Sequence, residues 1–142
     1  MLEKLKKDRV NKMRLWHQKL IDKLPRQQLL GQHRECCALR GNGWGKNHST
    51  VNYVFEYHPA KLVAYHYEVM NEMKARGYNL NEKWYEYRYR GKNSNEWKED
   101  FIFKLDENCK SDIIYPEHDE EYLKECIENL KEKGGVCRCY ED

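Results

Sequence analysis

The sequence contains no apolar run that approaches the roughly 20 residues needed to cross a lipid bilayer, and its first residues are charged rather than apolar like a signal peptide. It has only three prolines, and no low-complexity linker or internal repeat is visible. The net charge is only +2, so the molecule as a whole is not a polycation. These absences predict a cytoplasmic protein without a membrane segment.

What is present suits one folded domain. The chain has 142 residues, of which 39% are hydrophobic and 35% are charged. Eleven tyrosines and four tryptophans can fill a core, but such rings also form platforms on which nucleic-acid bases stack. The charge is uneven, because residues 1–14 carry six basic and two acidic side chains while residues 117–132 are acidic. A molecule with one basic face can bind a phosphate backbone.

Start and stop signals predict three main helices. Pro25 suits a first helical position, and the helix that follows is expected to run through Arg40 and end at Gly41. A second helix is expected over Pro59–Arg76. A third is expected from Asp119, a plausible N-cap, to Lys133.

The predicted fold is therefore mostly α, a compact single-domain helical bundle with three main helices, long irregular loops and little or no sheet. We expect residues 1–12 to form a charged N-terminal extension and residues 13–142 to form the domain. Residues 84–90 alternate like a short strand, but an extended loop fits them as well.

The first of these helices carries the residues with chemical interest. Gln28, Gly31 and Glu35 share one face, and Gln27 and Arg34 lie on the adjacent line. Glycine inside a helix costs about 1 kcal/mol relative to alanine, so something is expected to pack close to it. A neighbouring helix is the favoured explanation, and a ligand or a DNA strand is the alternative. Partial burial would suit Glu35 to proton transfer, whereas a surface ion pair would leave it without a chemical role.

Several segments keep a common order and spacing. They are Met13–Trp16 (Met-Arg-Leu-Trp), Leu24–Leu29, the pair Arg34-Glu35, Arg76–Leu80, and Tyr115–His118. Together they resemble the pyrimidine-dimer DNA glycosylase family, typified by phage endonuclease V, and the likeness extends thinly over most of residues 13–133.

The resemblance implies a DNA-repair N-glycosylase and AP lyase, a hydrolase that acts on pyrimidine dimers in damaged double-stranded DNA. In that family a free α-amine at the N-terminus attacks the anomeric carbon of the damaged nucleotide, a Schiff base forms, and β-elimination nicks the strand. The amine's position falls on Met13 and Arg14, and the matching glutamate, Glu35, moves protons on the sugar and the imine. We expect a monomer that needs no cofactor. The predicted DNA-contacting residues are Arg26, Gln27, Gln28, Arg34, Lys46, Arg88 and Arg90.

The chain also departs from the family's pattern. Arg14 stands where the family has the amine-bearing threonine, and twelve residues precede Met13. Leu15, Gln28 and Ala38 replace two arginines and a histidine that contact DNA in the family. Three explanations stay open: Met13 is the true start, the nucleophile differs, or the amine chemistry is lost. The last would leave a non-catalytic nucleic-acid-binding relative.

Two further segments allow a nucleic-acid role. The glycine-rich loop 41–50 lacks phosphate-loop spacing, but its free backbone N–H groups and Lys46 could hold a phosphate; a flexible turn between helices is equally compatible. Basic and aromatic side chains interleave over residues 83–98, which suits base stacking and phosphate contact. The alternative is a solvated edge whose tyrosines pack inward.

The six cysteines suit free thiols or metal ligands in a reducing compartment. Cys137 and Cys139, with Cys109 and Cys126 upstream, are weak candidates for a zinc site, and a small metal-binding or interaction protein is a further possible function. Cys126 fits the apolar face of its helix. The adjacent Cys36 and Cys37 point about 100° apart on a helix, so they are not expected to hold one ion together and are predicted to be buried thiols.

Overall fold

The computed structural model describes residues 15–46 and 52–132. Within them all regular structure is helical: η1 (Gln18–Lys23), α2 (Arg26–Arg40), α3 (Asn52–Phe55), α4 (Pro59–Ala75), η2 (Glu82–Tyr85), α5 (Ile102–Cys109) and α6 (Glu120–Glu132). The prediction of a mostly helical fold is confirmed. No helix in this part of the chain is both long and apolar enough to cross a membrane.

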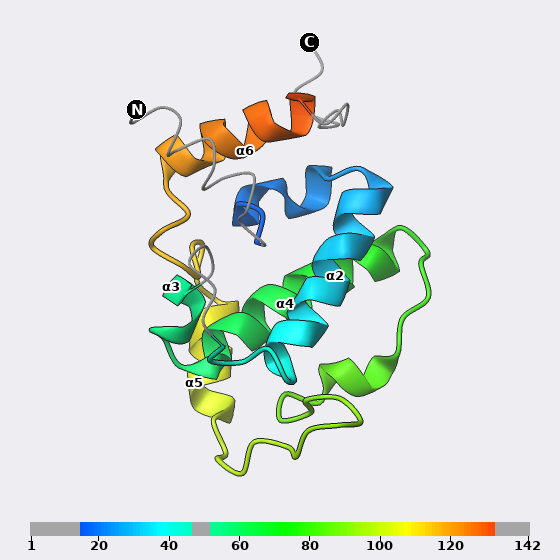
Figure 1. Cartoon of the computed structure of the whole chain (residues 1–142), viewed down its shortest axis with the longest axis vertical. Helices are drawn as coiled ribbons and strands as arrows, with labels where there is room; N and C mark the ends of the chain where they lie inside the picture. Colours follow the sequence, from blue (N-terminus) through cyan, green and yellow to red (C-terminus); the bar gives the residue numbers. More distant parts are fainter. Residues whose placement is uncertain (1–14, 47–51, 133–142) are drawn as a thin grey trace.

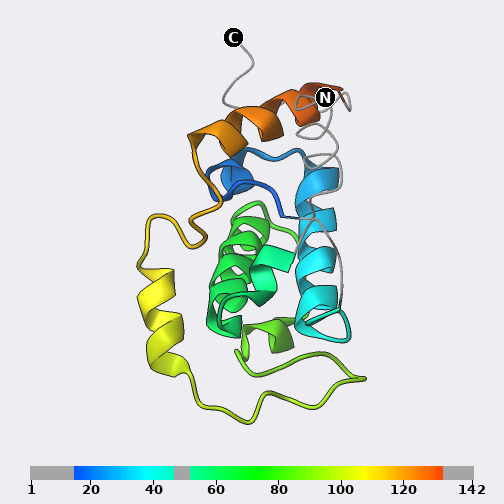
Figure 2. The same ribbon diagram turned by 60° about the vertical axis from the view of Figure 1, so that its left-hand side comes forward.

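Helix α4 is the centre of the molecule. Its buried residues, from Ala60 to Met73, surround the whole helix rather than one stripe, and it packs against α2, α5 and η1. Figures 1 and 2 show α2 running beside α4 in both views, with α6 lying across one end of the pair. This arrangement leaves one long side of α2 facing solvent.

The predicted helix ends that fall within the described residues are confirmed to within one residue, and Lys133, the predicted end of the third helix, lies outside them. Helix α2 follows Pro25, and the N–H of Gly41 donates to the carbonyl oxygens at its last turn. Gly77, after α4, has a φ of 83°, a left-handed conformation that glycine adopts without strain. The Asp119 carboxylate accepts a hydrogen bond from the N–H of Tyr122 at 2.8 Å and so caps α6 as expected.

Residues 84–90 form no strand; η2 leads into an irregular loop. The buried guanidinium of Arg40 explains this, because it donates to the carbonyl oxygens of Trp84 (2.8 Å), Glu86 (2.9 Å) and Tyr89 (2.9 Å). Carbonyl groups that a strand would offer to a neighbour are therefore bound to one side chain. Of the two alternatives for this segment, the loop is correct.

Helix α5 was not predicted. It has eight residues, and Leu105 is the one that it buries. So short a helix shows too little apolar periodicity to be recognised in the sequence.

Candidate active site

Helix α2 has two opposite faces. Leu29, Gln32, Cys36 and Leu39 are buried against the core. The residues of the other face are exposed or half-buried: Gln27, Gln28, Gly31, Arg34, Glu35 and Ala38. All of the α2 residues that the sequence singled out for DNA contact or catalysis except Arg26 thus share one solvent-facing stripe, and exposed Arg26 opens the helix.

Gly31 lies in the middle of this stripe, and no helix of residues 15–46 or 52–132 packs on it. Among the described residues, a Cβ built on Gly31 would meet only a guanidinium nitrogen of Arg34, at 3.7 Å. The described residues therefore give no support to the favoured explanation for this glycine, close packing of another helix.

Three buried side chains hold the backbone where the described chain begins. Gln32 Oε1 accepts a hydrogen bond from the N–H of Trp16 at 2.6 Å. The Tyr65 hydroxyl donates to the Trp16 carbonyl oxygen at 2.6 Å, and the Tyr122 hydroxyl donates to the Leu15 carbonyl oxygen at 2.6 Å. We call Gln32, Tyr65 and Tyr122 the N-terminal anchor.

The geometry and protonation of the N-terminal anchor both hold the dipeptide firmly. Its residues come from α2, α4 and α6, so three helices fix one dipeptide. Burial raises the pKa of both tyrosines well above the ordinary value, which keeps their hydroxyls protonated as donors. The Leu15 side chain is fully buried. It belongs to the core, which explains why no arginine that contacts DNA stands here.

Half-buried Glu35 lies one helical turn beyond Gln32. Three residues advance a helix by about 4.5 Å, so Glu35 lies one turn along α2 from Gln32, the residue that binds the anchored backbone. The expectation of partial burial for Glu35 is confirmed. Met13 and Arg14 lie outside the described residues.

The sequence profile of pyrimidine dimer DNA glycosylases matches residues 13–86, which include Leu15, Trp16, Gln32, Glu35 and Tyr65. The chain belongs to the pyrimidine dimer DNA glycosylase family. No curated protein and no solved structure gives a significant match. The family match begins at Met13, two residues before the anchored dipeptide.

The family's DNA-contacting role was also predicted for residues outside α2. Lys46 is exposed. Arg90 is engaged within the fold, since its guanidinium donates to the carbonyl oxygens of Arg40 (2.7 Å) and Gly41 (3.1 Å) and lies over the ring of Trp97. Arg88 is half-buried beside Tyr87. DNA contact by these three side chains stays a prediction.

In the described part of the glycine-rich loop, residues 41–46, several backbone N–H groups are already bonded within the fold. The N–H groups of Gly43, Trp44 and Lys46 all donate to backbone oxygens of the same region. A Cβ on Gly43 would lie 2.8 Å from the Ala38 carbonyl oxygen. The expectation of free N–H groups is wrong for these residues, and the glycine is needed for a close backbone contact.

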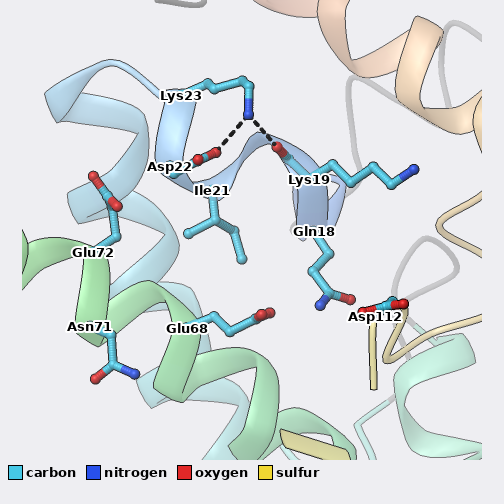
Figure 3. A pocket seen from close by; sticks show the side chains of 9 residues that line it. All are labelled: Gln18, Lys19, Ile21, Asp22, Lys23, Glu68, Asn71, Glu72 and Asp112. Carbon is cyan, nitrogen blue, oxygen red and sulfur yellow. Dashed lines mark hydrogen bonds and ion pairs between the residues drawn. The ribbon is translucent and has the colours of Figure 1, made fainter. Parts of the chain in front are cut away.

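A hollow of about 560 Å³ opens between η1 and α4 (Figure 3). Four carboxylates line it, against two lysines: Asp22, Glu68, Glu72 and Asp112. Burial raises the pKa of Glu68, whose side chain points into the hollow. An excess of negative charge repels DNA phosphates, so this hollow is unsuited to the family's substrate.

A second cluster joins α2 and α4 on the buried side, and the sequence did not reveal it. His33 Nδ1 lies 2.9 Å from His66 Nε2, and Cys37 Sγ lies 3.9 Å from each of these two atoms. His33 and Cys37 are four residues apart, a spacing that places them on one helix face and could have been noticed. Their partner His66 could be found only by knowing that α2 packs against α4.

The cysteine predictions have mixed outcomes. Cys36 and Cys126 are fully buried, as expected. Cys37 is half-buried and faces the polar cluster rather than apolar surroundings, so its prediction as a simple buried thiol is wrong. Burial raises the pKa of Cys37 to about 12, which makes it an unreactive thiol at neutral pH. Cys137 and Cys139 lie outside the described residues.

Proposed function

We propose that the chain is a DNA N-glycosylase and AP lyase that acts on pyrimidine dimers through an N-terminal α-amine, with Glu35 as the proton-transfer group. The observation that carries the proposal is the N-terminal anchor. It holds Trp16 through Gln32, which lies one helical turn before Glu35 on α2, and the family match begins at Met13, two residues before Leu15.

The reach of the chain fits this mechanism. Two residues span at most about 7 Å when extended. An amine on a chain that begins at Met13 therefore stays within about 7 Å of the anchored Leu15 backbone. An amine twelve residues further upstream has no such restraint.

An α-amine suits the chemistry. Its pKa is about 7.7–8.0 in an unperturbed chain, so a useful fraction is neutral and nucleophilic at physiological pH, unlike a lysine. The amine attacks the anomeric carbon, the base departs, and loss of a proton from the sugar of the resulting imine breaks the 3′ phosphate bond. Glu35 transfers the protons on the sugar and the imine in this sequence.

DNA would lie along the solvent-facing stripe of α2. Arg26 and Arg34 supply positive charge to phosphates, and Gln27 and Gln28 supply hydrogen bonds. The described residues leave room above Gly31 for a close approach of the DNA backbone to the helix. Extrusion of a nucleotide from the kinked duplex would bring the sugar to the amine.

The test is cleavage of a duplex that carries one cyclobutane dimer, by a chain that begins at Met13. Glu35→Gln should lower the cleavage rate by about 10²–10⁴-fold while DNA affinity changes little, because the carboxylate acts on protons rather than in binding. Glu107→Gln, at an exposed position on α5, is the matched control and should cleave normally. Salt-dependent DNA binding without cleavage by the unsubstituted chain would refute the proposal and leave a non-catalytic relative.

A further inference from the structure

We propose that His33, Cys37 and His66 form a binding site for a late first-row divalent metal ion of the zinc class, which ties α2 to α4. The ligand atoms of the three residues all lie within 4.8 Å of one another. Two imidazole nitrogens and one thiolate are the donors that such ions prefer to the oxygen ligands of magnesium or calcium.

The spacing of the donors fits one ion. Zinc bond lengths of about 2.05 Å to nitrogen and 2.3 Å to sulfur give tetrahedral edges of about 3.3 Å between two nitrogens and about 3.6 Å between nitrogen and sulfur. The corresponding separations are 2.9 Å between His33 Nδ1 and His66 Nε2, and 3.9 Å from Cys37 Sγ to each. Each edge differs from the ideal by less than half an ångström, so small side-chain rotations would complete the site.

The helices preform this arrangement. His33 and Cys37 are one turn apart on α2, and fully buried His66 comes from the facing side of α4. Cys37 also lines a hollow of about 370 Å³ between residues 41–43 and 90–94. This hollow offers an ion an entry path and leaves room for a water molecule as fourth ligand.

Arg40 sets the protonation of the cluster. Its guanidinium, which can only donate, lies 3.0 Å from His66 Nδ1. Nδ1 therefore accepts, and the proton of neutral His66 is on Nε2, from which it is donated to His33 Nδ1. An incoming ion takes the place of the proton on His66 Nε2, which makes His66 an imidazolate whose Nδ1 still accepts from Arg40, and the thiol proton of Cys37 leaves as well.

A divalent cation beside the buried, positively charged Arg40 would be repelled unless other positive charge leaves the cluster, and the loss of these two protons meets that need. A divalent ion that replaces two protons leaves the net charge of the cluster unchanged, so Arg40 meets the same total charge before and after binding. Arg40 also keeps its bonds to the carbonyl oxygens of Trp84, Glu86 and Tyr89, which do not involve the cluster.

The proposed site is separate from the catalytic proposal. Residues two positions apart on a helix point about 200° away from each other, so His33 and Cys37 face away from Glu35. A metal ion here would act on the stability of the α2–α4 pair. Its test can therefore use the protein without DNA, and its failure would leave the proposed function untouched.

The test is titration of the chelator-treated full chain with Co²⁺ and Zn²⁺. We expect one Co²⁺ per chain, with the visible bands of a tetrahedral thiolate-ligated ion, displacement by Zn²⁺, and a melting temperature that rises with Zn²⁺ concentration. Cys37→Ser should abolish the sulfur-to-cobalt band and weaken binding at least about tenfold. The double variant Cys137→Ser with Cys139→Ser, and Cys109→Ser, are matched thiol controls and should bind as the unsubstituted chain does.

Three results would overturn the site: no bound ion in the unsubstituted chain, unchanged binding by Cys37→Ser, or loss of binding in the tail double variant alone. Circular dichroism checks that each variant is folded. If Cys37→Ser does not fold, half-buried His33→Gln takes its place, and unchanged cobalt bands in that variant contradict the proposal.

Discussion

The hydroxyl of Tyr65 donates a hydrogen bond of 2.6 Å to the carbonyl oxygen of Trp16, across 49 positions of sequence. The same hydroxyl lies 3.0 Å from Gln32 Oε1, which accepts from the Trp16 N–H. One dipeptide is thus fixed to α2 and α4 together. In the proposed mechanism this fixes the distance between the chain's reactive end and Glu35.

Tyr65→Phe should show whether the anchor positions the amine for reaction or contributes to DNA binding. The change leaves the buried Trp16 carbonyl oxygen without this donor, which is expected to lower the free energy of unfolding by about 1–3 kcal/mol. A less restrained amine should reduce kcat of dimer cleavage by about 10–100-fold with a small change in KM.

Tyr57→Phe is the matched control for this measurement. Its hydroxyl donates to the Glu117 carboxylate and not to the anchored dipeptide. An equal fall of kcat in both variants, or a change confined to KM in Tyr65→Phe, would contradict a positioning role.

Two arginines predicted to contact DNA should behave differently. Exposed Arg34 lies on the α2 stripe, so Arg34→Gln should weaken DNA binding and reduce the slope of log K against log salt by about 1, with little change in melting temperature. Arg90 donates to two backbone oxygens inside the fold, so Arg90→Gln should lower the melting temperature first. The salt dependence of binding and thermal melting of both variants measure this. If Arg90→Gln instead lowers the salt slope and Arg34→Gln instead lowers the melting temperature, the DNA lies at the loop that carries Arg90 and not on α2.

Gly31→Ala should make the protein more stable and a weaker DNA binder. Of the residues that the structure describes, a Cβ at this position meets only Arg34, at 3.7 Å, and alanine favours a helix interior by about 1 kcal/mol over glycine. The free energy of unfolding should therefore rise by up to that amount. If DNA approaches the α2 backbone here, the added methyl group should raise the Kd. An unchanged Kd would show that the duplex does not lie against this part of α2.

Helix α2 shows how far sequence alone could go. Pro25 and Gly41 mark its ends because their backbone preferences are local, and the face that carries Glu35 follows from helix periodicity. The reason for Gly31 could not be predicted, since one sequence does not reveal whether a partner helix packs there. His66, and the anchor formed by Tyr65 and Tyr122, depend on contacts over long stretches of chain, which local patterns do not contain.

Burial of His118 should make stability depend on pH. His118 accepts the N–H of Gln18 at Nδ1 and contacts the Tyr53 hydroxyl at Nε2. Burial lowers its pKa from 6.5 to about 3. The folded protein therefore favours the neutral form of His118. The contribution of His118 to the free energy of unfolding is fully present above pH 6.5 and is lost as the pH falls from 6.5 towards 3.

The expected loss from His118 is at most about 1.4 kcal/mol of unfolding free energy per pH unit in that window. Urea unfolding between pH 7 and pH 4.5 measures it. His118→Asn, whose carboxamide oxygen can still accept the Gln18 N–H, should lose stability less steeply than the unsubstituted chain. Parallel pH profiles for the two proteins would show that His118 is not the group responsible.

The central claim is that the α-amine beside Glu35 is the nucleophile. The most direct measurement is borohydride reduction of the protein on abasic or dimer-containing duplex DNA, followed by mass spectrometry of the linked peptide. For a chain that begins at Met13, the account predicts a sugar adduct on the α-amine of the N-terminal peptide, and little or no adduct when the chain begins at Met1. An adduct on a lysine side chain, or no adduct from either form, would contradict it.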